Sequence, residues 1–308
     1  MAGAINQFQL TSMFVDDRRV SANTNLNFQL QLNRASGSAV DNNDYLIIEI
    51  PDGDDSRTTA TWDQDRQAVC DMKNGGLALK CEILHGKACM ITLKAQKNLV
   101  IRGSISNFIN PISIKGILGM QATLFKQDGT AEAIATSMSL NDFEAADVDV
   151  ALEPSSKIIG SKGNNLAIKV TPQTRLTAMG SSQRLVLVAT IPPYFENAGQ
   201  ELMIAASRPD PCTVNIGKLL SCSFSRTRLL RIDFEYLPQK NMLQEVLFTV
   251  GNFNNPITES MGGFAVDILD EEEYLIAQTT QDLKLTGINQ PAAFKSWDFN
   301  FVDTAASG

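Results

Sequence analysis

The sequence predicts an all-β protein made of two tandem immunoglobulin-like antiparallel β-sandwich domains. Its 308 residues suit two domains of ordinary size. The same order of strand-like segments, cysteines and prolines occurs twice, and no stretch combines helical periodicity with capping residues. We therefore expect a first sandwich over residues 1–150, a second over residues 151–290, and a C-terminal aromatic strand over residues 291–308.

The two halves share landmarks that lie about 140 residues apart. An apolar strand ends in Ile-Pro at Pro51, and a similar strand ends in Ile-Pro at Pro192. An Asn-Phe-x-Asn-Pro-Ile motif follows at residues 107–112 and again at residues 252–257. Because the landmarks keep their order, we predict that the two halves superpose strand on strand.

Short strands with one buried face fill each half. Residues 26–32 alternate apolar and polar side chains, and residues 166–170 do the same, which is typical of a half-buried strand. Turn signals such as Gln-Asp-Gly at residues 127–129 separate these runs. Breakers that include Pro154 predict the linker between the domains over residues 147–165.

Four cysteines occupy matching places in the two halves. Cys70 and Cys81 correspond to Cys212 and Cys222. We predict that each pair forms a disulfide across a hairpin, where two Cβ atoms can come within bonding distance. Buried free thiols in a cytosolic protein are the alternative, and zinc is disfavoured because the short spacing of a zinc knuckle is missing.

The fifth cysteine, Cys89, alternates with Ile91 and Leu93, and its counterpart in the second half is Leu230. We predict that it is free and buried, as a small apolar residue of the core. An odd cysteine in a secreted protein can also form an intermolecular bond, which is the alternative.

The sequence offers little that could support catalysis, and we predict that the chain is not an enzyme and binds no cofactor. Its one histidine, His85, lies in a turn, where no catalytic triad can be assembled around it with any specificity. Carboxylates cluster at residues 52–55, at Asp147 and Asp149, and at residues 270–273. We expect solvated turns there, with calcium as the alternative for Asp147 and Asp149 between the domains.

The composition of the chain disfavours nucleic acid as a partner and a transmembrane location. The formal net charge is −8, which disfavours nucleic acid because its phosphates repel an acidic protein. No apolar run approaches the length of a transmembrane segment.

An aromatic strand is predicted near the end of the sequence, with Trp297, Phe299 and Phe301 at alternating positions and Phe294 three residues before them. Three accounts fit: the strand folds back onto the second domain, it completes a neighbouring subunit by strand addition, or it opens the next repeat of a longer array. We favour a neighbouring subunit, which makes these residues an assembly interface.

Arg226, Arg228 and Arg231 form the one basic concentration. We predict that they join the assembly interface by meeting the acidic residues 270–273 of another subunit. A solvated edge that discourages wrong strand pairing is the alternative.

With these motifs, the chain resembles the long tandem β-sandwich repeat domains of large secreted or surface structural proteins of ciliates and other protists. The resemblance covers most of both halves and lies in the Ile-Pro strand, the cysteine-bracketed segment, and the Asn-Pro motif followed by a strand with an Asp-Gly turn. It implies structural beads in a fibre, a coat or an adhesive surface, and it implies no catalytic residue.

The function we expect is that of an extracellular or cell-surface structural protein, which self-associates head to tail into a filament, coat or surface layer. The alternative is an adhesion or carbohydrate-binding module of a surface protein. A sugar-stacking platform would have to use Trp62, because the other tryptophan lies in the terminal strand.

Overall fold

The computed structural model describes twelve stretches of the chain, and within them every regular element is a strand. The described residues are 6–32, 40–51, 58–72, 78–95, 100–177, 182–191, 212–224, 229–237, 243–257, 259, 261–285 and 287–291. No helix in this part of the chain is long and apolar enough to cross a membrane. The predicted fold class, two tandem antiparallel β-sandwiches, is confirmed.

Within the described residues, each half has ten strands. Those of the first are β1 (Asn6–Val15), β2 (Asn23–Leu32), β3 (Tyr45–Glu49), β4 (Thr61–Trp62), β5 (Cys70–Met72), β6 (Ala78–His85), β7 (Ala88–Leu93), β8 (Val100–Ile109), β9 (Ile117–Phe125) and β10 (Ala131–Leu140). Those of the second are β11 (Ala146–Pro154), β12 (Asn164–Pro172), β13 (Gln183–Thr190), β14 (Cys212–Val214), β15 (Lys218–Phe224), β16 (Leu229–Tyr236), β17 (Val246–Phe253), β18 (Met261–Leu269), β19 (Leu275–Gln278) and β20 (Leu283–Leu285).

The strands of each half pair in one continuous order that bends into two layers. In the first half the order is β4-β8-β2-β1-β10-β9-β3-β7-β6, and β5 also pairs with β8. The strand β1 joins the layers, because its start runs parallel to β10 while the rest pairs antiparallel with β2. In the second half the order is β14-β17-β12-β11-β19-β18-β13-β16-β15, and β20 also pairs with β18.

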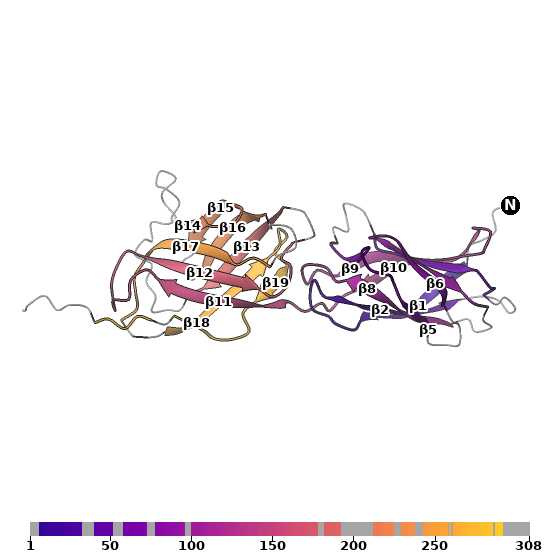
Figure 1. The fold of residues 1–308 in the computed structure, drawn as a ribbon, viewed down its shortest axis with the longest axis horizontal. Helices are drawn as coiled ribbons and strands as arrows, with labels where there is room; N and C mark the ends of the chain where they lie inside the picture. The colour runs from indigo at the N-terminus through magenta and orange to yellow at the C-terminus, as the bar shows by residue number, and fades with distance from the viewer. Residues whose placement is uncertain are drawn as a thin grey trace, which may run out of the picture.

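Nine strands of each half take matching places in the pairing order, and only β4 and β20 among the described strands fall outside the match. Each strand from β1 to β3 takes the place of one from β11 to β13, and β5 to β10 take the places of β14 to β19. Registers agree as well, since Cys81 lies opposite Ile91 on β7 while Cys222 lies opposite Ile232 on β16. Figure 1 shows the two sandwiches end to end along the long axis of the molecule.

The core of each sandwich is the buried face of the alternating strands. In β2 the side chains of Leu26, Leu30 and Leu32 are buried, and in β12 those of Leu166 and Val170 are buried. This confirms the alternation expected from the sequence, in which every second side chain points between the layers.

The predicted linker over residues 147–165 is wrong in its first half. The strand β11 already begins at Ala146 and pairs with β12 and β19 of the second sandwich. Its Asp-Val-Asp-Val alternation has the period of a strand, and the chain breaks only after Pro154. The crossing between the two sandwiches is therefore residues 141–145, and the boundary expected at residue 150 falls inside β11.

Candidate functional site

Both predicted disulfides are present and link the two layers of their sandwich. Cys70 bonds to Cys81 with the Cα atoms 5.6 Å apart, and Cys212 bonds to Cys222 with the Cα atoms 6.1 Å apart. The prediction that each pair spans a hairpin is wrong. In the first domain β5 pairs with β8 in one layer, whereas β6 pairs with β7 in the other. The strands β14 and β15 are separated between layers in the same way.

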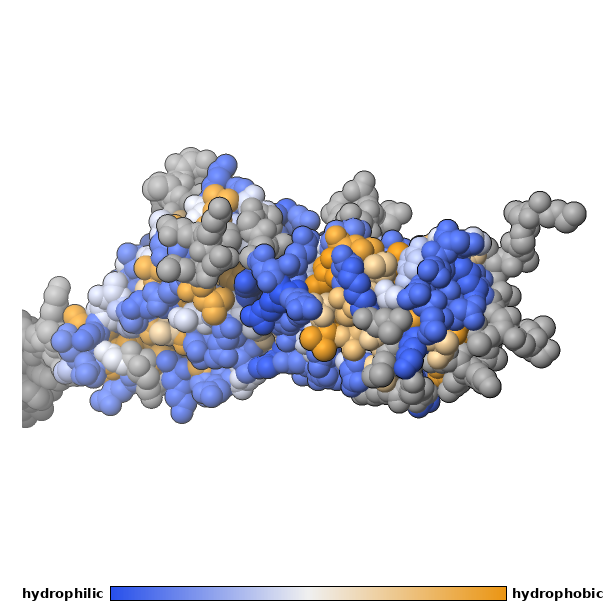
Figure 2. Space-filling model, turned by 45° about the vertical axis from the view of Figure 1, so that its right-hand side comes forward, coloured by the Kyte–Doolittle hydropathy of each residue, from blue (hydrophilic) through white to orange (hydrophobic). Residues whose placement is uncertain are grey.

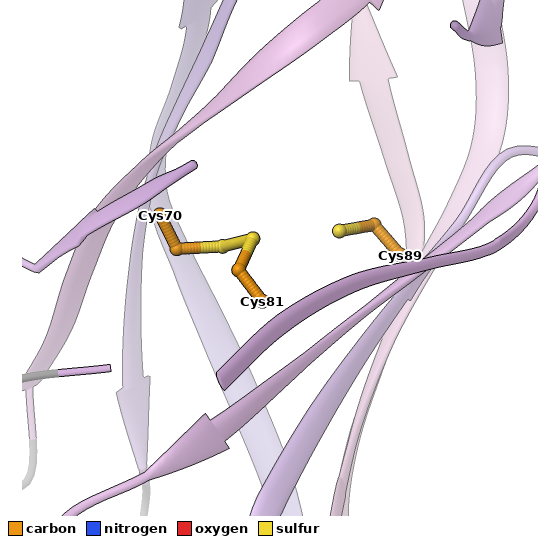
Figure 3. A group of neighbouring side chains, drawn as sticks. All are labelled: Cys70, Cys81 and Cys89. Carbon is orange, nitrogen blue, oxygen red and sulfur yellow. A yellow bond between two sulfur atoms is a disulfide. The ribbon is translucent and has the colours of Figure 1, made fainter. Parts of the chain in front are cut away.

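The free cysteine lies beside the first disulfide. Cys89 is fully buried on β7, which confirms the prediction of a free core cysteine. Figure 3 shows its side chain extending toward the bond between Cys70 and Cys81, and the three sulfur atoms lie within 4.8 Å of one another. Two of these sulfurs are already bonded together, so the cluster is not a set of three thiolates for a metal. Burial raises the pKa of the Cys89 thiol to about 12.

We expect Cys89 to resist alkylation by iodoacetamide at about pH 8 in the folded protein and to react fully once the chain is unfolded in urea. The thiolate is the reactive form, and burial both shields the sulfur and keeps it protonated. Mass spectrometry of non-reduced peptides measures the labelling. A Leu84→Cys variant supplies an exposed control, because Leu84 on the neighbouring strand β6 is 45% exposed. Labelling of Cys89 in the folded protein at the rate of that control would contradict the burial.

The two domains contact each other at a junction that several bonds hold together. Ile114 donates its backbone N–H to the carbonyl oxygen of Leu275 at 2.9 Å. The Nζ atom of Lys115 lies 2.6 Å from Oε2 of Glu272 and 5.6 Å from the ring centroid of Tyr274. Ion pairs at a surface contribute little, so the backbone bond and the packing around it matter more for the geometry.

A small crevice at the junction brings residues of both domains together. Ile112 and Ser113 of the first domain line it, and so do Gln183 and Asp270 of the second. Ile112 is only 6% exposed there. A further hydrogen bond crosses the junction, from Oγ of Ser21 to the carbonyl oxygen of Arg175 at 3.1 Å. The two sandwiches are thus held in a defined end-to-end arrangement.

The loops at the junction are organised by the Asn-Pro motif. The side-chain Nδ2 atom of Asn110 donates to the carbonyl oxygens of Asp17 at 2.7 Å and Arg19 at 2.8 Å. Asn107 at the start of the motif has a φ of 62°, in the left-handed region that asparagine tolerates. The motif was visible in the sequence, but its role of fastening the loop after β1 was not predicted.

Arg231 pairs with acidic residues of its own domain, and a contact of the basic residues with another subunit stays a prediction. Nη1 of Arg231 lies 2.9 Å from Oε1 of Glu273, and Nη2 lies 3.3 Å from Oδ1 of Asp233, all within the second domain. The acidic turn that Arg231 was expected to meet in a neighbour is therefore its partner in the same chain, since β16 and the turn after β18 lie on one layer. Arg226 and Arg228 lie outside the described residues.

Burial raises the pKa of the Asp233 carboxyl, but hydrogen bonds from Ser221 and Arg231 outweigh burial and leave the pKa below its ordinary value. Arg231 and Asp233 are thereby held as an ion pair on the domain's own layer.

Trp62 cannot serve as the sugar-stacking platform that the alternative function would require. Trp62 is 1% exposed and packs edge-on against Phe108 with the ring centroids 5.5 Å apart. A side chain that fills the core offers no face to a sugar. The aromatic residues Phe294, Trp297, Phe299 and Phe301 of the predicted interface lie outside the described residues.

The other candidate residues are polar surface groups. His85 is exposed at the end of β6, and its Nδ1 atom accepts the backbone N–H of Lys87 at 3.1 Å. Oδ2 of Asp149 accepts a hydrogen bond from Gln173 at 3.1 Å. Among the described residues no third carboxylate joins Asp147 and Asp149 within ligand distance, and calcium binding there stays the untested alternative. The acidic residues 52–55 lie outside the described part.

The surface around the junction differs between the domains. Figure 2 shows apolar side chains gathered on the first domain close to the junction, beside a mostly hydrophilic area of the second. Exposed apolar residues of the first domain next to this boundary include Ile114 and Leu118, which are 37% and 62% exposed.

No protein-family model and no curated relative matches this sequence. One similar solved structure is the BSP domain of a biofilm-associated protein. It is 9% identical with a TM-score of 0.28, and the match covers 92% of this chain and 59% of that one. The N-terminal domain of the Streptococcus gordonii adhesin Sgo0707 matches at 11% identity and a TM-score of 0.30, over 85% of this chain and 60% of that one.

The collagen-binding domain of the Erysipelothrix rhusiopathiae surface protein RspB matches at 10% identity and a TM-score of 0.25, over 91% of this chain and 93% of that one. This chain spans about three fifths of the length of the first two proteins.

Proposed function

We propose that this chain is an extracellular structural protein whose tandem β-sandwich domains assemble head to tail into a filament, coat or surface layer. The observation that carries the proposal is the junction, where backbone and side-chain bonds hold two sandwiches of the same strand order end to end. A domain that can stack on a copy of itself in this way provides the unit from which longer rods are built.

The disulfides support the extracellular location. Each domain carries one bond between its layers, at the same place in the strand order. Disulfides persist in oxidising compartments and are rare in the cytosol. The resemblance to secreted and surface repeat domains of protists supports the same location and a role as structural beads.

A structural role also suits the side chains that the chain has available. The one histidine is exposed at a turn, and the buried thiol of Cys89 is held in its unreactive form. We therefore propose that the chain is not an enzyme. The alternative of a carbohydrate-binding module is disfavoured, because Trp62 lies in the core and cannot stack on a sugar.

We expect the purified full chain, kept under oxidising conditions, to form rods that lengthen with concentration, because each copy carries two ends able to stack. Negative-stain electron microscopy and sedimentation velocity measure this. Deleting residues 294–308 tests the strand-addition hypothesis: two folded domains should remain, and loss of the rods would show that the terminal strand is needed for assembly. Particles of single-chain length at every concentration would overturn the proposed assembly, whereas rods formed by the shortened chain would overturn strand addition alone.

A further inference from the structure

The far end of the second domain reproduces the loops that the first domain presents at the junction. In both places the Asn-Pro motif and the loop after the first strand are bound by the same backbone and side-chain hydrogen bonds. Three hydrogen bonds of the first domain each have a counterpart in the second, and all six are 2.8 to 2.9 Å long. The bond from Val20 N to Glu144 O matches that from Ile159 N to Gln290 O, and the bond from Ser21 N to Pro111 O matches that from Gly160 N to Pro256 O. The bond from Asn110 Nδ2 to Arg19 O matches that from Asn255 Nδ2 to Ile158 O. Even the left-handed φ recurs, at 57° for Ser21 and 67° for Gly160.

These equivalent loops differ in what covers them. Ile112 follows the Asn-Pro pair of the first domain and is 6% exposed, in the crevice against Gln183 and Asp270. Ile257 follows the Asn-Pro pair of the second domain and is 84% exposed. We use the name end face for Ile158, Gly160 and Ile257. A Cβ atom on Gly160 would lie 3.9 Å from Cγ2 of Ile257, so these two residues are neighbours, and Ile158 is itself 39% exposed.

The part of the second domain that covers Ile112 also has a counterpart in the first domain. The covering turn follows β18, with Asp270 N bonded to Tyr274 O at 2.9 Å. The turn after β9 has the same form, with Lys126 N bonded to Thr130 O at 2.9 Å. Because β10 runs from this turn toward the crossing at residues 141–145, the turn lies at the end of the first domain away from the junction. Asp128 in this turn takes the place of Glu272 and keeps its negative charge.

We propose that the end face of the second domain docks the turn at residues 126–130 in the first domain of a second copy of this chain. The inference rests on the proposed head-to-tail assembly and names the surfaces that form it. Each chain has one junction already made inside it, and the same two surfaces occur once more at its opposite ends, where no other described segment of the chain covers Ile257. Equivalent surfaces of homologous domains are expected to meet in the same way when a second copy supplies the missing side.

The contact between copies is weaker than the junction within the chain. The segment of the second domain that corresponds in sequence to Ile114 and Lys115 begins with Glu259 and has no lysine in the place of Lys115. The ion pair between Lys115 and Glu272 is therefore not reproduced between copies. A cation is offered instead by Lys162, an exposed residue of the loop that follows Gly160. The two sides of the internal junction also belong to one polypeptide chain, which raises their effective concentration relative to each other. Association between copies is therefore concentration-dependent and relies on burying Ile257.

The test compares two variants of the full chain by sedimentation velocity. Ile257→Asp places a charge in the end face and should weaken association about tenfold or more. Val69→Asp is the matched control, because Val69 is a β-branched side chain that is 65% exposed elsewhere on the first domain. The control should associate within about twofold of the parent chain. Circular dichroism checks that both variants keep their strands.

Amine cross-linking of a mixture of isotopically labelled and unlabelled chains identifies the occupant of the end face. Cross-links between Lys162 of one copy and Lys126 of another support the inference. Cross-links between Lys162 and Lys295 within one copy would show that the chain's own terminal segment covers the face, and would overturn it. Rods that persist unchanged in Ile257→Asp would also overturn it while leaving head-to-tail assembly intact. Absence of association in the parent chain would instead overturn the proposed function.

Discussion

Replacing Phe234 with alanine is expected to lower the free energy of unfolding of the second domain by about 3–5 kcal/mol. Phe234 on β16 is 1% exposed, and its ring meets that of Phe248 on β17 edge-on with the centroids 4.9 Å apart. The two strands belong to opposite layers, so the pair fills the space between them. Alanine leaves a cavity that the surrounding strands can only partly close, because both are fixed by their ladders.

Urea unfolding followed by hydrogen–deuterium exchange of peptides from β16 and β17 measures the loss. The matched control is Phe14→Ala, since Phe14 on β1 is 51% exposed and its removal should change stability by less than about 0.5 kcal/mol. Similar losses for the two variants would show that Phe234 is not a central residue of the core. With a total stability of about 5–15 kcal/mol for a domain, the Phe234 variant is expected to be partly unfolded in mild denaturant.

Removing the disulfide of the second domain, by the double variant Cys212→Ala and Cys222→Ala, is expected to destabilise that domain by about 3 kcal/mol. The bond closes a loop between residues 10 positions apart, which restricts the unfolded chain. It also ties β14 in one layer to β15 in the other, where the sheets have no shared ladder at this edge. We expect separation of the layers to begin there once the bond is gone.

The first domain provides the control for this prediction. In that double variant, hydrogen exchange of β7 and β8 should be unchanged, whereas replacing Cys70 and Cys81 with alanine should affect β7 and β8 and spare the second domain. An equal loss in both domains from either double variant would contradict independent, layer-linking bonds. Reduction of the parent chain should reproduce the sum of the two effects, because the two disulfides lie in separate domains.

The sequence by itself determined the features that depend on local order. Alternation along residues 26–32 and 166–170 predicted buried strand faces, because a strand turns every second side chain to the same side. Cys70 and Cys81 were predicted as partners, and so were Cys212 and Cys222, because each pair recurs at the same place in a repeated order. The alternation around Cys89 likewise predicted that its thiol faces the core.

Only the tertiary structure decided which strands lie beside one another. It placed β5 and β6 in different layers, so the disulfide links two sheets rather than a hairpin. It put Arg231 against Glu273 of its own domain and Trp62 inside the core. Pairing between strands depends on contacts between distant residues, and one sequence records the period of each strand but not its neighbour. The junction could not be predicted for the same reason. Ile114 and Leu275 are joined there through their backbones, so the identity of their side chains does not indicate the contact.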